Sequence, residues 1–215
     1  MLHRIQEDLE RLYDISYTLN VHDYVCDEDT ARAAVGDAVL RGEVVWVREM
    51  GQEIALGLYI SQDAIQALVE NVSTANWRTE NFWAWSLATE GVSHLVYLHY
   101  KATLSESVSL LELELQAEVD KYVIGMMQSS ENISLVLHSA QLRRQLFEDS
   151  EYLDSPDSEE GQRYRQATRL AASYAAFLEQ TFLAHRAVHA FSAHLRRFYR
   201  LGGSAKFQQC MPRTR

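Results

Sequence analysis

The sequence predicts a mainly α protein, namely a helical bundle with a small N-terminal α+β portion that contains one β-hairpin. Only 9 Gly and 2 Pro occur among 215 residues, which leaves few tight turns and favours long helices over a many-stranded sandwich. Apolar residues recur at helical spacing through most of the chain. We expect the N-terminal portion to cover residues 1–75 and the bundle residues 76–215, with an acidic linker at 148–158.

The N-terminal portion begins with an amphipathic pattern that predicts a helix over residues 2–19, and a second, short helix starts near Asp29. Between residues 43 and 60, β-branched and bulky side chains stand on both sides of a break at residues 50–52, which predicts the hairpin. No Asn-Gly or Asp-Gly pair marks its turn, so the turn type stays open. A further helix is expected to follow the hairpin as far as residue 72.

The rest of the chain is predicted to be helical. Asp157 resembles an N-cap with Glu160 as its capping-box partner, which predicts the start of the last and longest helix. The four helices are expected at about residues 79–102, 106–128, 131–147 and 158–201.

Charge is distributed unevenly along the chain. The net charge of -10 argues against a general nucleic-acid binder. Residues 148–160 carry seven acids and no base, whereas the chain from residue 161 onward holds nine arginines and Lys206 against one acid. We expect the acidic segment to dock on the basic helix; the alternative is an anion-binding surface on that helix. Its contact residues would be Arg196, Arg197 and Arg200.

Cysteine usage and the N-terminus predict a cytoplasmic, soluble protein. Cys26 and Cys210 lie far apart and form no CxxC pair, as expected of reduced thiols. The first fourteen residues are charged and lack the apolar core of a signal peptide. Residues 82–100 approach the length of a membrane span, but they include Glu90 and His94, so we expect a buried core helix and no membrane contact.

Glu90 and His94 are the strongest candidates for a site. They stand four residues apart on one side of a helix whose apolar residues leave no wide polar face. A buried carboxylate must be paired, protonated or bound to a metal. Two interpretations stay open: a structural Glu–His or Glu–Arg pair, or a functional site in which Glu90 and His94 are the catalytic residues.

Two further segments offer metal ligands. Glu114 and Glu118 border the apolar stripe of the next helix, and Glu118, which is closer to the stripe, is the better second carboxylate. The alternative for Glu118 is a solvated pair with Lys121. His185 and His189 are also four apart and can share a metal from one helical face, although solvent-facing histidines are the alternative.

Together these side chains would hold a single Zn²⁺, Mn²⁺ or Fe²⁺ ion in the bundle. The zincin motif is absent because Arg186 replaces its glutamate, and a second Glu/His pair for a di-iron centre is missing. The predicted ligand set is Glu90, His94, Glu118, His185 and His189.

The sequence supports two functions. The first is a small helical metalloprotein with a single-metal centre of hydrolytic or ligand-binding type. The second is a non-catalytic regulatory or adaptor protein whose basic C-terminal helix binds an anionic partner, either another protein or a second copy of the chain. Nucleic acid is not expected as a partner.

Overall fold

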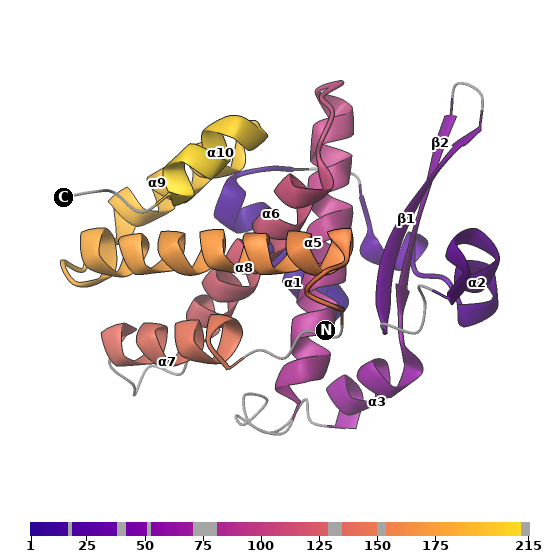
Figure 1. Ribbon diagram of the computed structural model, residues 1–215, viewed down its shortest axis with the longest axis horizontal. Coiled ribbons are helices and arrows are strands. Elements are labelled where there is room, and N and C mark those ends of the chain that lie inside the picture. The colour runs from indigo at the N-terminus through magenta and orange to yellow at the C-terminus, as the bar shows by residue number, and fades with distance from the viewer. Residues whose placement is uncertain are drawn as a thin grey trace.

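The structure, a computed structural model, describes residues 1–16, 19–37, 42–50, 53–70, 81–128, 135–149 and 154–211. It is mainly α with a small α+β portion, as predicted. In Figure 1 the hairpin stands on one side of α5, and α7 to α10 lie on the other side with α6 between them. The elements are α1 (Leu2–Tyr13), the 3-10 turn η1 (Val21–Asp23), α2 (Glu28–Val35), β1 (Glu43–Met50), β2 (Glu53–Ile60), α3 (Gln62–Glu70), α5 (Phe82–Thr103), α6 (Leu110–Met127), α7 (Leu135–Phe147), α8 (Glu159–Leu178), the π-helical turn η3 (Glu179–Leu183), α9 (Val188–Tyr199) and α10 (Gly203–Cys210).

The predicted hairpin is confirmed. β1 and β2 pair antiparallel from Glu43 opposite Ile60 to Met50 opposite Glu53. Its turn, residues 51–52, lies outside the described residues. The backbone N–H of Ser61 donates to the carbonyl of Gly42 at 2.7 Å, which closes the open end of the hairpin. This anchor fixes the start of β1 beside α5.

Gly91 lets the hairpin approach α5 closely. A Cβ atom at this position would lie 2.7 Å from Leu58 Cδ1 and 3.0 Å from both Cγ and Oε1 of Glu43. A side chain at position 91 would therefore push both residues away. The glycine thus allows the Glu43 carboxylate to lie beside the α5 backbone.

The first helix is shorter than predicted. It ends at Tyr13 because Asp14 adopts a left-handed conformation (φ 54°) and its N–H donates to the carbonyl of Glu10. The prediction of one helix over residues 2–19 is therefore wrong beyond Tyr13. Leu19 still contributes a buried apolar side chain, which explains why the periodic pattern continued.

The predicted helix over residues 158–201 is wrong as one continuous element. α8 gives way to η3, where the N–H of Ala184 reaches the carbonyl five residues earlier, and Arg186 then takes a left-handed φ of 53° before α9 begins. No glycine or proline marks this break. At the other end Ser158, rather than Asp157, is the N-cap, and its hydroxyl accepts from the N–H of Gly161.

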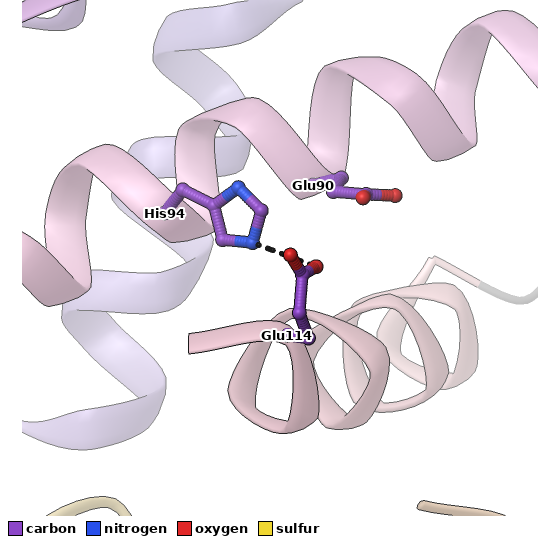
Figure 2. A group of neighbouring side chains, drawn as sticks. All are labelled: Glu90, His94 and Glu114. Atoms are coloured by element: carbon purple, nitrogen blue, oxygen red, sulfur yellow. Dashed lines mark ion pairs between the residues drawn. The ribbon is translucent and has the colours of Figure 1, made fainter. Parts of the chain in front are cut away.

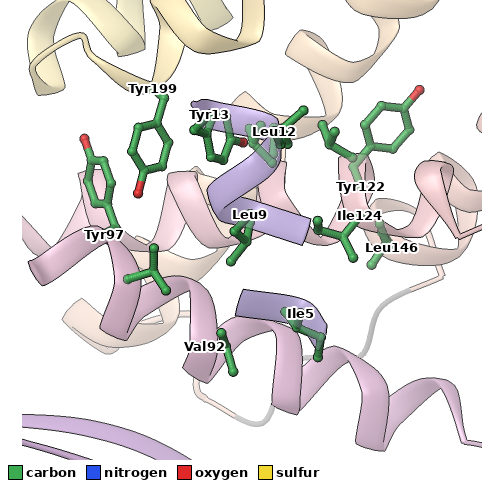
Figure 3. Packing of buried hydrophobic residues seen from close by; sticks show 14 of the residues in the cluster. Ile5, Leu9, Leu12, Tyr13, Val92, Tyr97, Tyr122, Ile124, Leu146 and Tyr199 are labelled. Atoms are coloured by element: carbon green, nitrogen blue, oxygen red, sulfur yellow. The ribbon is translucent and has the colours of Figure 1, made fainter. Parts of the chain in front are cut away.

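One hydrophobic cluster joins α1, the hairpin, α3 and the helices from α5 to α10. Figure 3 shows Ile5 and Leu9 of α1 against Val92 of α5 and Ile124 of α6. α5 is buried on nearly all sides, as predicted, and α6 is buried well beyond the apolar stripe that Glu114 and Glu118 were expected to border. The proposed domain boundary at residue 75 stays a prediction because residues 71–80 lie outside the described part. Within that part, no helix is both long and apolar enough to cross a membrane.

Candidate metal centre

α5 and α6 bring three candidate metal ligands together. Glu90 and His94 lie one turn apart on α5, and Glu114 reaches them from α6 (Figure 2). One ligand atom from each of the three lies within 4.8 Å of the other two. His94 Nε2 is 3.5 Å from Glu114 Oε2. Two carboxylates and one imidazole therefore converge from two adjacent buried helices.

The imidazole of His94 lies between two carboxylates. Its Nδ1 is 3.7 Å from Oε1 of Glu43, the first residue of β1, on the side away from Glu114. His94 is only 6% exposed, and among the described residues its Nε2 has no hydrogen-bond partner. Burial lowers the pKa of His94, but Glu114 and Glu43 outweigh that effect and raise the pKa well above its ordinary value. The two neighbouring carboxylates therefore favour the protonated form of the ring when no metal ion is bound.

Glu43 is buried with the same cluster. Burial raises the pKa of its carboxyl group, His94 lowers it, and the nearby Glu90 and Glu114 raise it again, so that the net shift is upward. Oε1 of Glu43 has no hydrogen-bond partner of good geometry among the described side chains. Glu43 is therefore a buried acceptor that faces the Nδ1 side of His94.

Lys121 joins Glu90 to Glu118. Its Nζ is 3.0 Å from Glu90 Oε2 and 2.9 Å from Glu118 Oε1. Burial raises the pKa of Glu90, but Lys121 and His94 lower it by a larger amount, so the net shift is downward. Burial dominates at Glu118 and raises its pKa. The Glu118–Lys121 pair considered from the sequence is confirmed, but it is largely buried rather than solvated.

Arg163 of α8 completes the cluster. Its Nε is 3.7 Å from Glu114 Oε1, and its Nη2 lies 3.4 Å from the more exposed Glu160. We define the acidic cluster as the carboxylates of Glu43, Glu90, Glu114 and Glu118 with the cations His94, Lys121 and Arg163. With every group counted as ionised, the four carboxylates outnumber the three cations by one.

The structure brings together only part of the predicted ligand set. Glu90 and His94 lie in the cluster, whereas Glu118 is held by Lys121 and Glu114 takes the place beside His94. His185 lies in the exposed turn after η3 and His189 at the exposed start of α9. The expectation that these histidines share one helical face is wrong because the helix breaks between them.

A second buried polar network occupies a neighbouring face of α5 and α6. Asp120 accepts hydrogen bonds from Ser93 at 2.6 Å, from Gln116 at 2.8 Å and from the hydroxyl of Tyr13. Burial outweighs these bonds and raises the pKa of Asp120 to about 6. Lys206 of α10 donates to the Tyr97 hydroxyl at 2.7 Å and to Gln116. This network ties both ends of the described chain to the central helices.

Two of the three arginines predicted to bind a partner make contacts within the fold. Arg196 donates from Nε to the carbonyl of Leu12 at 3.1 Å, and Arg200 donates to that of Asp14 at 3.2 Å. Both bonds satisfy carbonyls at the C-terminal end of α1. Arg197 is exposed. Partner binding by these residues stays a prediction.

Sequence reasoning missed Glu43 and Arg163. Neither carried a local signal, because one begins a strand and the other lies among several arginines of α8. Glu114 was considered but ranked below Glu118, since both border the same stripe. Comparison with known proteins adds nothing to this assignment: no protein-family model, curated protein or solved structure matches the chain.

Proposed function

We propose that the protein is a metalloprotein that binds one divalent transition-metal ion through Glu90, His94 and Glu114. The observation that carries the proposal is the buried Nε2 of His94, which has no hydrogen-bond partner among the described residues and faces Glu114 at 3.5 Å. Mixed imidazole and carboxylate ligands suit Zn²⁺, Mn²⁺ and Fe²⁺. The ligand atoms already lie within 4.8 Å of one another, so small side-chain movements would close them around an ion.

The charges of the acidic cluster support this proposal. Buried charges are stable only when they are compensated. A divalent ion at Nε2 would replace the proton of the imidazolium, because a metal-bound histidine is neutral. The exchange adds one net positive charge and brings the four carboxylates, Lys121, Arg163 and the ion to neutrality.

Glu43 has the position of an orienting residue. Metal-bound histidines commonly donate their other ring N–H to a carboxylate, which fixes the tautomer and strengthens the ligand. Nδ1 of His94 faces Glu43 Oε1 at 3.7 Å, and this contact leaves Nε2 for the ion. Glu43 would therefore hold the ring without binding the metal itself.

Three protein ligands favour a reactive or ligand-binding ion over a purely structural one. Structural zinc sites are closed by four protein ligands, whereas catalytic sites keep one position for water or substrate. The chemistry that such an ion would supply is a bound water of lowered pKa, a source of hydroxide near neutral pH. The side chains of Glu90 and Glu118 are 15% and 13% exposed, compared with 7% for His94, so the cluster is most accessible on their side. We therefore propose a hydrolytic or ligand-binding centre.

Metal stoichiometry tests the proposal. Tag-free protein would be reconstituted with Zn²⁺, Mn²⁺ or Fe²⁺ and measured by elemental and native mass spectrometry. We expect one ion per chain in the wild type and in His189→Ala, which alters an exposed histidine. Glu90→Gln, His94→Ala and Glu114→Gln should each lose the ion while circular dichroism shows a folded chain. Wild-type protein that takes up no ion and keeps its thermal stability in chelator would overturn the proposal.

A further inference from the structure

Lys121 lies between two carboxylates of the acidic cluster. Its ammonium bridges two carboxylate oxygens, 3.0 Å from Glu90 Oε2 and 2.9 Å from Glu118 Oε1, in a position that is 5% exposed. We propose that Lys121 occupies the second cation site of a four-carboxylate cluster and thereby limits the protein to one metal ion. This inference rests on the metal centre proposed above.

Glu90 is common to both cation positions. It belongs to the ligand group with His94 and Glu114, and it also contacts Lys121. A carboxylate has two oxygens, so one glutamate can bridge two cations. Paired metal ions in proteins stand about 3.5–4 Å apart and commonly share ligands in this way. Glu90 would be the bridging ligand once an ion replaced the ammonium.

Glu118 holds a spare ligand atom. Its Oε1 accepts from Lys121, but its Oε2 is buried and has no hydrogen-bond partner among the described residues. Oxygens 2.9–3.0 Å from the ammonium would need to move inward by about 1 Å to reach the 2.0–2.2 Å typical of carboxylate–metal bonds. Rotation of two long side chains can supply that movement, so the helices need not shift.

The charge balance of the cluster explains why the Lys121 ammonium can take the place of a second metal ion. With every carboxylate counted as ionised, one divalent ion together with Lys121 and Arg163 balances the cluster, and a second ion would add positive charge that no further carboxylate of the cluster balances. When Lys121 is replaced by a neutral residue, one negative charge remains. A second divalent ion that carries a hydroxide then restores neutrality, with the proton of the water released to solvent.

Arg163 does not bridge two carboxylates of the cluster as Lys121 does. Its Nε is 3.7 Å from Glu114 and its Nη2 pairs with Glu160, which lies outside the cluster. Its side chain is 20% exposed, compared with 7% for Lys121. The guanidinium therefore compensates charge at the rim, whereas the ammonium fills a bridging position.

The test is the number of ions that Lys121→Gln binds. Wild type and Lys121→Gln would be titrated with Mn²⁺ and Zn²⁺ and measured by native mass spectrometry. We expect one ion per chain in the wild type and two in Lys121→Gln, with a coupled electron paramagnetic resonance signal for the manganese pair. Adding Glu118→Gln to Lys121→Gln should return the stoichiometry to one. Lys101→Gln, which alters a buried lysine outside the cluster, is the control and should bind one ion.

Each outcome is decisive. One ion in both wild type and Lys121→Gln overturns the inference but leaves the metal centre intact. No ion in the wild type shows instead that the proposed function is wrong. If Lys121→Gln is unfolded without metal, its helicity is measured against added Mn²⁺. Recovery that is complete at two equivalents supports the inference, and recovery that is complete at one equivalent, or no recovery, overturns it.

Discussion

The ammonium of Lys206 on α10 is completely buried 2.7 Å from the hydroxyl of Tyr97 on α5. The Tyr97 ring lies 4.1 Å from the nitrogen and the Phe198 ring 5.2 Å from it, so aromatic faces replace much of the water that a cation normally holds. Burial nevertheless lowers the pKa of Lys206 to about 7, although Glu112 and Asp120 raise it. A lysine inside the core thus titrates near neutral pH.

Lys206 should make folding stability depend on pH. Its pKa is lower in the folded than in the unfolded chain, so the folded state loses stability as the pH falls from about 10.5 to 7, and the loss is nearly complete below pH 7. Between pH 7 and pH 9 we expect the free energy of unfolding of the wild type to rise by about 2 kcal/mol relative to Lys206→Met. Urea unfolding of both proteins at the two pH values measures this change. A constant difference between them would contradict the assignment.

Two buried tyrosines allow a matched test of the Asp120 network. Tyr13 donates its hydroxyl to Asp120, whereas the hydroxyl of Tyr174 has no hydrogen-bond partner among the described residues. Tyr13→Phe should lower the free energy of unfolding by about 1–3 kcal/mol because it leaves a buried acceptor short of a donor. Tyr174→Phe should change it by less than about 0.5 kcal/mol. Equal losses from the two substitutions in chemical denaturation would show that the Tyr13–Asp120 bond contributes nothing.

Glu43→Gln tests the orientation of His94. If Glu43 accepts from Nδ1 as proposed, the amide should weaken metal binding by about 10- to 100-fold without removing a ligand. Competition with a fluorescent zinc chelator measures the affinity. Glu148→Gln, which alters a half-exposed carboxylate paired with Arg143, is the control and should bind like the wild type. Equal affinity in Glu43→Gln and wild type would remove the orienting role from Glu43.

Neighbouring arginines on α9 should differ in their effect on stability. Arg196 donates to the carbonyl of Leu12, and Arg197 is exposed. Arg196→Ala should cost about 0.5–1.5 kcal/mol, the usual contribution of such a hydrogen bond. Arg197→Ala should stay within about 0.5 kcal/mol of the wild type, as most surface substitutions do. Thermal and urea unfolding of the two variants measure these changes. If Arg196→Ala is as stable as the wild type, its hydrogen bond to Leu12 does not stabilise the packing of α1.

The elements that the sequence predicted correctly are those specified by local patterns. The β-branched runs on either side of residues 50–52 determined the hairpin, and the apolar surroundings of Glu90 and His94 identified α5 as a core helix. The break at Arg186 could not be foreseen because it depends on a π-turn and a left-handed residue in a segment without glycine or proline. Because this break was not predicted, His185 and His189 were wrongly expected to lie on one helical face.

The sequence predicted only the two residues of the candidate site that lie on the same helix, Glu90 and His94 of α5. Glu90 and His94 are neighbours through helical geometry alone. The choice between Glu114 and Glu118 depends on how α6 is rotated against α5, and a helix buried on nearly all sides carries no amphipathic signal for that rotation. Glu43 comes from a strand 51 positions before His94, and such contacts arise from tertiary packing rather than from local sequence.

The contacts of Tyr13 with Asp120 and of Lys206 with Tyr97 join residues 107 and 109 positions apart. Chains emerge from the ribosome in sequence order, and domains generally fold as units once their segments are available. Tyr13 precedes both helices and can reach Asp120 as soon as α6 has emerged, whereas Tyr97 and Gln116 leave the exit tunnel before their partner Lys206 has been synthesised. Completion of this part of the core therefore has to wait until synthesis has passed residue 206.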